Sequence, residues 1–241
     1  MYISGDNSCL NCIYHNPKKI RDIFINIEKK ESYIDIIKKN KLENLTKFLN
    51  KKELLFINKE DKRGSNDIII RREKYETSQL NSIISPQETN SLIVVADQLT
   101  DQNNLGNIMR TSLLIGVHGV ILPEHSSASI TGTTSMTSSG AVEIIKFHLS
   151  KNLSRTLEEL KNKGYWIYSL DMKGERIDNN FYFDKRSVII IGNEGKGIRK
   201  NILEKSDFKI SLYQEKIKGI DSYNAANSLA MAAHHYKLNF S

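Results

Sequence analysis

Three glycines surround a glutamate in the segment GNEGKGI, which begins at the end of the apolar run SVIIIG at residues 187–192. The glycines are Gly192, Gly195 and Gly197, and the carboxylate between them is Glu194. Glycine lets a backbone turn with positive φ or approach a ligand closely. The order G-x-x-G-x-G reverses the dinucleotide fingerprint G-x-G-x-x-G, and the segment lacks the spacing of a phosphate-binding P-loop. It indicates a close-fitting loop, with a tight turn and a solvated glutamate as the alternative.

Two further polar loops contain side chains suited to binding. The first, at residues 97–110, contains Asn104 and, six residues later, Arg110, so both lie on roughly one side of an expected helix near its start. The second places Ser222 and Asn224 just before an alanine-rich helix. Asn and Ser also cap helices, so each loop taken alone fits either anion recognition or a structural role.

From residue 92 onward, short apolar runs alternate with helical patterns. Strands this apolar, separated by helices, predict an α/β fold with a parallel sheet covered on both faces. The expected strands are 92–96, 119–122, 144–149, 165–170, 187–192 and 208–212, and the expected helices are 104–115, 152–163 and 222–238. Ligands of such sheets bind at the carboxyl ends of the strands, so we expect the three polar loops to form one site.

The three motifs occur in a fixed order: N-x-G-x-x-x-R at residues 104–110, G-x-E-G-x-G at 192–197 and S-x-N at 222–224. In this order and spacing, the chain resembles the SpoU family of RNA ribose 2′-O-methyltransferases, also called TrmH, within the SPOUT superfamily. The resemblance covers about residues 92–238 and includes the segment S-S-G-A at 138–141. A nucleotide-binding oxidoreductase is disfavoured because G-x-G-x-x-G is absent.

The resemblance implies a SPOUT-type parallel sheet with a C-terminal trefoil knot, which holds S-adenosylmethionine in a bent form. Knots are otherwise almost absent from proteins, so the strand pattern alone would not predict one. The family also implies a homodimer with the RNA site between subunits. The implied cofactor-binding residues are Gly192, Ile210, Leu212 and Tyr223. The implied catalytic residues are Asn104, Arg110, Glu194, Ser222 and Asn224.

The sulfonium methyl of S-adenosylmethionine is already activated, so the reaction needs alignment of a ribose 2′-hydroxyl and removal of its proton, without a metal. Arg110 is the family's usual candidate for contacting that hydroxyl. A guanidinium has no acceptor and stays protonated, so we expect Arg110 to hold a neighbouring phosphate instead of acting as a base. Asn104 would orient this arginine, and the residue that accepts the proton stays open.

Several positions depart from the family pattern. Asp101 and Gln102 stand where Asp-Pro is usual, Ser211 stands where the motif I-P-M has proline, and Tyr223 stands where S-L-N has leucine. The H-Q-G that often closes the N-terminal domain is replaced by KRGSNDI at residues 62–68. The altered I-P-M and S-L-N positions keep a second hypothesis open, a catalytically inactive RNA-binding or assembly factor of the same fold.

The composition and hydrophobic pattern of the sequence change near residue 80. This change predicts an N-terminal RNA substrate-binding domain at 1–80, a linker at 81–91 and a catalytic domain at 92–241. The first domain is expected to be a small α/β module, similar to a ribosomal-protein fold, whose opening helix resembles residues 14–24. Its expected helices are 17–30 and 41–52, and its expected strands are 32–37, 53–57 and 67–71. Because such a domain precedes the catalytic one, ribosomal RNA is the expected substrate, with a guanosine of 23S RNA first and transfer RNA as the alternative.

Composition narrows the class of protein. At 241 residues with 39% hydrophobic and 26% charged side chains, the chain can bury a core and is not expected to be disordered. Residues 1–85 contain 17 basic and 12 acidic side chains, which is +5 of the total net charge of +7, and this excess favours a polyanionic partner. No apolar window is long enough to span a membrane or form a signal peptide, which predicts a soluble, cytoplasmic protein. The cysteines, Cys9 and Cys12, suit a reducing compartment, and with His15 they offer at most three ligands where structural zinc takes four.

Overall fold

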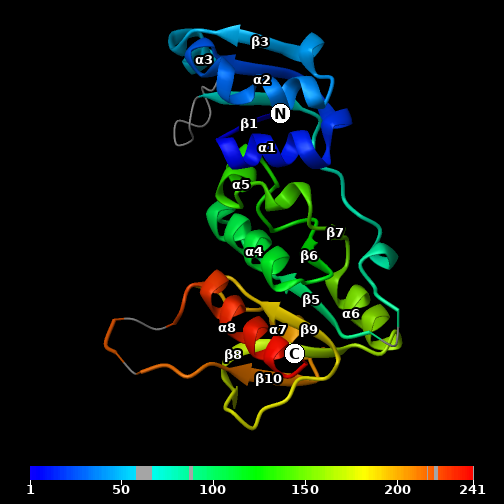
Figure 1. Cartoon of the computed structure of the whole chain (residues 1–241). Coiled ribbons are helices and arrows are strands. Elements are labelled where there is room, and N and C mark those ends of the chain that lie inside the picture. Colours follow the sequence, from blue (N-terminus) through cyan, green and yellow to red (C-terminus); the bar gives the residue numbers. More distant parts are fainter. Residues whose placement is uncertain (58–66, 87–88, 216, 220–221, 241) are drawn as a thin grey trace. The chain divides into compact units, whose positions relative to one another are not determined.

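The computed structural model describes residues 1–57, 67–86, 89–215, 217–219 and 222–240 (Figure 1). The chain divides into two compact units, which we call the N-terminal unit and the C-terminal unit. The N-terminal unit comprises Met1–Glu76 and Ser129–Ile144, and the C-terminal unit comprises Thr77–Ala128 and Ile145–Ser241. In the described part of the chain, no helix has the length and apolar character needed to cross a membrane. Residues 62–66 of the segment that replaces H-Q-G lie outside the described residues.

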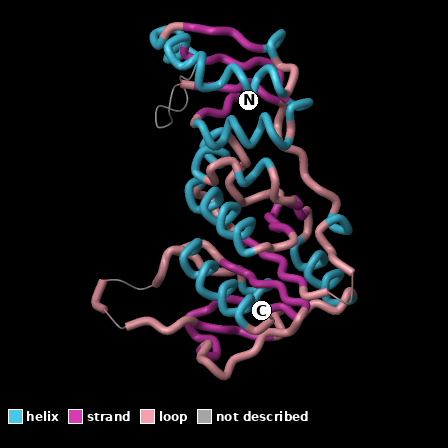
Figure 2. The backbone as a smooth tube through the Cα atoms, viewed as in Figure 1, coloured by secondary structure: helices cyan, strands magenta, loops and turns pink. Residues whose placement is uncertain are grey.

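The C-terminal unit is built on a six-stranded sheet in the order β10-β8-β9-β5-β6-β7, and every neighbouring pair is parallel. Figure 2 shows the strands in magenta and the helices in cyan. Its strands are β5 (Ser91–Ala96), β6 (Gly119–Pro123), β7 (Phe147–Ser150), β8 (Trp166–Arg176), β9 (Arg186–Ile191) and β10 (Phe208–Ser211). The central strands β5 and β9 are buried along their whole length, as strands covered on both faces are. The predicted α/β fold with a parallel sheet is confirmed.

Helices cover both faces of this sheet. They are α4 (Gln102–Ile115), α6 (Leu153–Asn162), α7 (Lys200–Leu203) and α8 (Ala225–Leu238), with a 3-10 turn at Leu80–Ser82. One face carries a core in which Ile93 and Val95 of β5 pack with Leu157 of α6. On the other face, α8 contacts α4 and β9. Leu80 and Ile83 join the first of these cores, so Ile83, which lies within the linker expected at 81–91, is packed into the C-terminal unit.

The N-terminal unit has a mixed four-stranded sheet in the order β1-β4-β2-β3. Its strands are β1 (Tyr2–Ser4), β2 (Ile20–Asn26), β3 (Thr46–Leu49) and β4 (Ile68–Arg72). Its helices are α1 (Asp6–His15), α2 (Lys30–Lys39), α3 (Lys51–Ile57) and α5 (Gly132–Thr137), and its 3-10 turns are Pro17–Lys19, Ile27–Lys29, Glu43–Leu45 and Ala141–Glu143. The strand predicted at 67–71 corresponds to β4.

The other elements predicted for residues 14–57 are wrong. The helix expected at 17–30 is mainly β2, because buried Ile23 and Ile25 alternate with a less buried neighbour and fit a period of two. The strand expected at 32–37 is part of α2, in which Tyr33 and Ile37 are buried four residues apart, as on one face of a helix. The segment 41–52, expected to be a helix, contains a 3-10 turn at Glu43–Leu45, then β3 and the first residues of α3, and the strand expected at 53–57 is part of α3. The opening helix is α1, which ends where the segment 14–24 begins.

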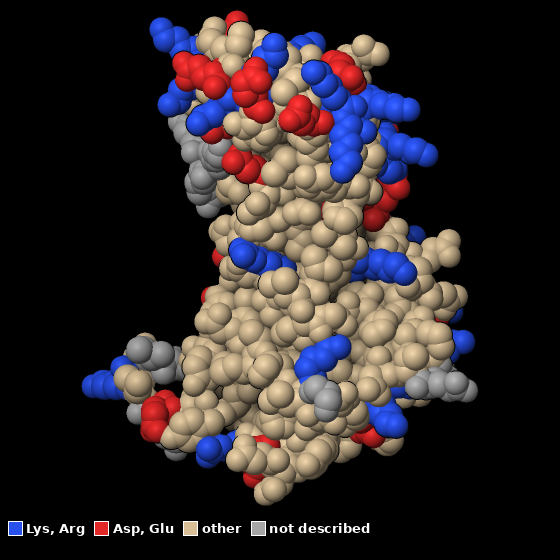
Figure 3. All heavy atoms as spheres, viewed as in Figure 1, with Lys and Arg blue, Asp and Glu red and all other residues tan. Residues whose placement is uncertain are grey.

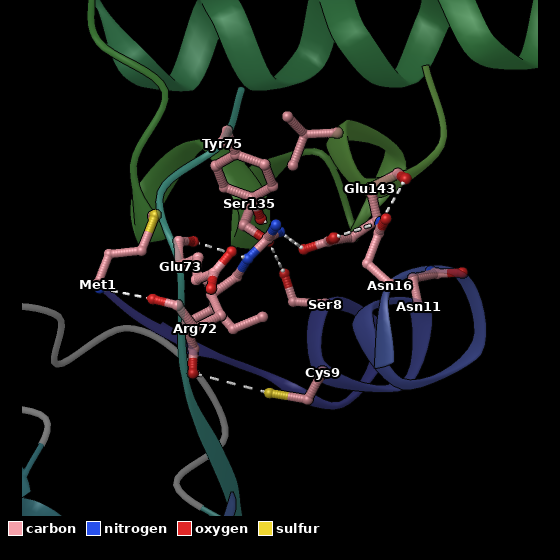
Figure 4. A network of polar contacts seen from close by, with 12 residues as sticks. Met1, Ser8, Cys9, Asn11, Asn16, Arg72, Glu73, Tyr75, Ser135 and Glu143 are labelled. Carbon is pink, nitrogen blue, oxygen red and sulfur yellow. Dashed lines mark hydrogen bonds and ion pairs between the residues drawn. The ribbon is translucent and has the colours of Figure 1, made fainter. Parts of the chain in front are cut away.

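The segment Ser129–Ile144 is held to the N-terminal unit by a buried polar network (Figure 4). Arg72 forms an ion pair with the Glu143 carboxylate, and neither side chain is more than 4% exposed. The Tyr75 hydroxyl donates to the same carboxylate at 2.6 Å, and the Asn16 amide donates to its second oxygen at 2.9 Å. All described polar partners of this carboxylate thus come from residues 1–76.

The S-S-G-A segment at 138–141 lies in the same interface with α1. The Asn11 amide donates to the backbone oxygen of Ser139 at 3.0 Å. Gly140 has φ +80°, and a Cβ at this position would come within 2.8 Å of the Asn11 Cβ, so only glycine fits. The sequence boundaries place this segment in the domain at 92–241, whereas its contacts group it with residues 1–76.

Candidate active site

The polar side chains of three loops meet at the carboxyl ends of the C-terminal unit's strands. The Asn104 amide donates to Glu194 Oε1 at 2.9 Å, and the Asn224 amide donates to Asn104 Oδ1 at 2.8 Å. Asn224 also donates to Glu194 Oε1, which closes the triangle. These residues are 30 to 120 positions apart in the sequence, and the parallel strands bring them together.

Each member of the triangle is placed by a different element. Asn104 lies in the first turn of α4, is 9% exposed, and follows the N-cap Asp101, whose side chain accepts the backbone N–H of Asn103. Asn224 is the N-cap of α8 and accepts the backbone N–H of Ala226 through Oδ1. Because that oxygen is occupied by the helix, the NH₂ group of Asn224 faces Asn104 and the carboxylate.

Glu194 lies in a tight loop after β9. Asn193 Oδ1 accepts the backbone N–H groups of Gly195 at 2.9 Å and of Lys196 at 3.1 Å, and the backbones of Asn193 and Gly197 form a reciprocal pair of hydrogen bonds. Gly197 has φ +68°, and a Cβ on Gly192 would lie 2.3 Å from the carbonyl carbon of Gly197. Glycine is therefore required at both positions for the loop to close.

A cavity of about 450 Å³ opens beside this loop and falls within the size range of small-molecule sites. Its wall is formed by the middle of β8, the ends of β9 and β10 and the start of α8. The wall includes all four residues expected to bind a cofactor, which are Gly192, Ile210, Leu212 and Tyr223. Ile210 is fully buried, whereas Tyr223 is 40% exposed. Glu194 and Ser222 also line the cavity, so the polar triangle and the cavity share a boundary.

The structure brings together most of the predicted site. Asn104, Glu194 and Asn224 are in direct contact, and Ser222 lies on the cavity wall. Arg110 is an exposed residue of α4 and is not part of the cavity wall formed by the described residues, whereas Asn104 is buried. The expectation that both lie on one side of the helix is therefore wrong, because six residues leave two helical side chains about 120° apart.

Two residues of the site were missed in the sequence. Asp97 is fully buried directly after β5. Its carboxylate binds the guanidinium and the backbone N–H of Arg199, which follows the loop at residues 192–198, here called the glycine loop. A carboxylate next to an all-apolar strand is the sequence signal that could have indicated this pair, because a buried charge needs a partner. The middle of β8, at residues 170–173, also lines the cavity and carries no motif.

Within the described ranges, no group of three or more His, Cys, Asp or Glu side chains is arranged to hold a metal ion. Cys9 and Cys12 are both buried free thiols of the N-terminal unit. Cys9 points its sulfur toward the backbone oxygens of Ile3 and Ile68.

Comparison with known proteins gives the family. The sequence pattern of the SpoU rRNA Methylase family matches residues 91–234, which include the three loops and the cavity wall. The chain belongs to this family. The family inferred from the three motifs is therefore confirmed.

Two relatives of this SpoU family member illustrate the similarity. The chain is 35% identical over 141 residues to the putative TrmH family tRNA/rRNA methyltransferase YacO of Bacillus subtilis, a match that covers 57% of each protein. It is 28% identical over 220 residues to the 23S rRNA (guanosine-2′-O-)-methyltransferase RlmB of Neisseria meningitidis, covering 91% of this chain and 87% of the relative. The chain thus spans only 57% of the first relative's length but most of the second's.

Solved structures with the same fold extend over nearly the whole chain. The SpoU methyltransferase AviRb of Streptomyces viridochromogenes, in complex with the cofactor AdoMet, has a TM-score of 0.79 at 18% identity and covers 98% of this chain, with 88% of its own length matched. The AdoMet-bound rRNA methyltransferase of Sinorhizobium meliloti has a TM-score of 0.77 at 18% identity, covering 100% of this chain and 87% of its own. At these identities the likeness shows the fold.

Proposed function

We propose that this SpoU family member is an S-adenosylmethionine-dependent RNA ribose 2′-O-methyltransferase. The observation that carries the proposal is the Asn104–Glu194–Asn224 triangle, which joins all three family motifs at the edge of one cavity. The cavity fits the cofactor in size and in its glycine-lined wall, where Gly195 and Gly197 carry no side chain that would cover the backbone. Two structural neighbours are described with AdoMet bound, which supports the same ligand here.

The bound cofactor would supply an activated methyl group on a sulfonium. The chain's own contribution is positioning, which can account for about 7–11 kcal/mol of a barrier in favourable cases. Gly192, Ile210, Leu212 and Tyr223 would hold the cofactor against the wall they form. Glu194 fixes the orientation of both asparagine amides through its Oε1 atom.

Arg110, Asn104 and Ser222 have proposed roles toward the RNA. Arg110 would hold the phosphate beside the reacting ribose, because a guanidinium donates in a planar fork that matches phosphate oxygens. Asn104, in the same helix, would orient this phosphate clamp, and Ser222 would contact the nucleotide from the cavity wall. The group that accepts the hydroxyl proton is not assigned.

Ribosomal RNA is the proposed substrate, with a guanosine of 23S RNA as the first candidate. The similarity to RlmB supports this substrate, since the match covers 91% of the chain and so includes most of the N-terminal unit as well as the SpoU family region at residues 91–234. On the face shown in Figure 3, Lys and Arg side chains stand out from the N-terminal unit with Asp and Glu between them, so phosphate contacts can be made there. Transfer RNA is the alternative, since YacO is named for both substrates.

A C-terminal trefoil knot, a homodimer and a cytoplasmic location are further parts of the proposal. The whole-chain likeness to SpoU structures supports the knot. The alanines Ala225, Ala226, Ala232 and Ala233 of α8 are buried within this chain, so they form its core and do not supply the dimer face, and the homodimer is proposed from the family resemblance. Light scattering at micromolar concentration should give twice the chain mass.

The second candidate is an inactive RNA-binding or assembly factor of the same fold, which Ser211 and Tyr223 motivate because they replace the family's usual residues. Isothermal titration with S-adenosylmethionine separates the candidates, since only the enzyme requires cofactor binding. Mapping 2′-O-methyl groups in RNA from cells with and without the gene then identifies the nucleotide. Cofactor binding and one gene-dependent methyl group support the proposal, whereas the absence of both would overturn it.

A further inference from the structure

Asp97 is the fully buried acidic residue at the carboxyl end of β5. Its backbone N–H donates to the oxygen of Ile191, the last residue of β9, at 2.8 Å. The carboxylate is therefore fixed between the two central strands, at the place where both of their loops begin. A buried carboxylate is stable only when it is paired and hydrogen-bonded.

Arg199 supplies all of the partners described for this carboxylate. Its backbone N–H donates to Oδ2 at 2.9 Å, and its guanidinium donates to Oδ1 through Nε at 2.9 Å and through the terminal nitrogen at 2.6 Å. Arg199 is the residue that immediately follows the glycine loop and precedes α7. The pair therefore ties the C-terminal end of the glycine loop, which follows β9, to the end of the neighbouring strand β5.

A second contact fastens the near end of the same loop. The side-chain amide of Asn193 donates to the backbone oxygen of Gln98, the residue after Asp97, at 3.2 Å. Both ends of the stretch 193–199 are thus tied to residues 97 and 98, and Glu194 lies between the two ties. The same stretch forms one wall of the cavity, including Gly195, Lys196 and Gly197.

We propose that Asp97 and Arg199 are positioning residues of the methyl-transfer site. Acting through the glycine loop, they hold Glu194 against Asn104 and Asn224 and hold the backbone wall of the cofactor cavity in place. Neither side chain lines the cavity, so their effect on the cofactor is transmitted by the loop. The identity of the cofactor in this inference rests on the proposed function, whereas the contacts that hold the loop do not depend on it.

The C-terminal unit contains a second, more exposed ion pair outside the site, whose aspartate side chain is 21% exposed where that of Asp97 is fully buried. Asp207 accepts the backbone N–H of Ile167 at 2.8 Å and the Lys161 ammonium at 2.6 Å, so it also binds one backbone donor and one cation. It lies just before β10, near the start of β8, at the amino ends of the strands. A purely structural role for Asp97 would lower the free energy of unfolding in Asp97→Asn but leave the cofactor affinity of the folded protein at the wild-type level.

The test compares wild type, Asp97→Asn, Arg199→Lys and Asp207→Asn in the full chain. The first readout is the dissociation constant of S-adenosylmethionine by isothermal titration, and the second is hydrogen exchange of the backbone amides of Gly195, Lys196 and Gly197. We expect Asp97→Asn to weaken cofactor binding by about tenfold or more and to speed exchange in the loop, since a hydrogen bond to a charged group is lost. Arg199→Lys should weaken cofactor binding and speed loop exchange less than Asp97→Asn does, because lysine keeps the positive charge and loses only the planar fork of the guanidinium. Asp207→Asn should leave both readouts at the wild-type level.

Cofactor affinity within about twofold of wild type together with unchanged loop exchange in Asp97→Asn would overturn the proposal, as would equal effects in Asp207→Asn. If wild type itself does not bind S-adenosylmethionine, the proposed function fails, and the exchange measurement alone still decides the positioning claim. If Asp97→Asn does not fold, Arg199→Lys carries the test, because the Arg199 side chain is 34% exposed and its lysine form keeps a charge beside Asp97.

Discussion

At the scale of single residues, the orientation of two amides depends on one carboxylate and one helix. Asn224 gives its oxygen to the first turn of α8 and its NH₂ group to Glu194 and Asn104. Turning this amide around would place its NH₂ group against the Ala226 N–H and its oxygen against the carboxylate, so both ends oppose the change. Glu194 is therefore the acceptor that sets which group each asparagine presents.

Glu194→Gln tests this role. Glutamine keeps the size of the side chain but removes the charge and adds an NH₂ group that faces two other amides. We expect single-turnover methyl transfer to fall by about 100-fold or more, as when a preorganised polar group is lost. Because Glu194 is exposed, the free energy of unfolding should change by less than about 0.5 kcal/mol. Glu204→Gln, at an exposed position outside the cavity wall, is the control and should transfer at the wild-type rate.

Arg110→Lys tests the proposed phosphate contact. Lysine keeps the positive charge and loses the planar fork, so the ribose would be held less accurately, and we expect transfer to fall by about 100-fold. The affinity for S-adenosylmethionine should stay the same, because Arg110 is not part of the described cavity wall. Arg155→Lys, an exposed arginine of α6, is the matched control. A normal transfer rate in Arg110→Lys would remove Arg110 from the proposed mechanism.

At the scale of elements, β5 and β9 are predictable from sequence because strands buried on both faces are continuous apolar runs. The N-terminal elements are not, because their short amphipathic segments contain isoleucine and lysine in patterns that fit two periods. Asn104, Glu194 and Asn224 were found from motifs whose order the sequence displays. The position of Asp97 directly after an apolar strand indicates a buried carboxylate, but its partner Arg199 could not be identified, because the pairing depends on two strands being neighbours, which no local pattern records.

The contact between the N-terminal unit and its segment Ser129–Ile144 can be tested with two adjacent arginines of β4. Arg72→Ala leaves the Glu143 carboxylate buried without its cation, which should cost about 3–5 kcal/mol of the free energy of unfolding. Arg71→Ala removes an exposed ion pair with Asp22 and should cost less than about 1 kcal/mol. Chemical denaturation of both variants measures the difference. Equal losses would mean that the Glu143 network does not stabilise the unit.

The packing of α1 predicts a dependence of stability on alkaline pH. Burial, with Glu143 as a second cause, raises the pKa of the Cys12 thiol to about 12 from its ordinary value of 9.0. Above pH 9 the unfolded chain releases this proton while the folded chain keeps it, so stability should fall as the pH rises from 9 toward 12. Cys12→Ala should show a smaller fall over this range in urea unfolding at a series of pH values. An identical pH dependence in both proteins would contradict the assignment to Cys12.

At the scale of the whole molecule, the two compact units are interleaved in sequence, because Ser129–Ile144 belongs to the first unit while its flanks belong to the second. A truncation that removes residues 1–76 would strip Glu143 of Arg72, Tyr75 and Asn16 together. Loss of RNA binding in such a truncated chain could then reflect misfolding. Point substitutions on the surface are the sharper way to ask which unit binds RNA.

The last prediction is that lysines of the N-terminal unit contribute more to RNA affinity than lysines of the C-terminal unit. A triple Lys→Gln variant at exposed N-terminal positions is compared with a triple variant at exposed C-terminal positions. The first set is Lys38, Lys39 and Lys41, and the second is Lys151, Lys163 and Lys185. Each lost phosphate contact should lower the slope of log affinity against log salt by about 0.7–0.9.

We therefore expect the N-terminal variant to bind total ribosomal RNA more weakly and with a flatter salt dependence, as measured by filter binding between 50 and 200 mM salt, roughly the range in which counterion release dominates. Thermal unfolding should be unchanged in both variants, because all six side chains are exposed. A flatter salt dependence of RNA affinity only in the C-terminal variant would place the phosphate contacts on the C-terminal unit instead. The excess of +5 in residues 1–85 would then be a property of the solvated surface, with no part in binding RNA.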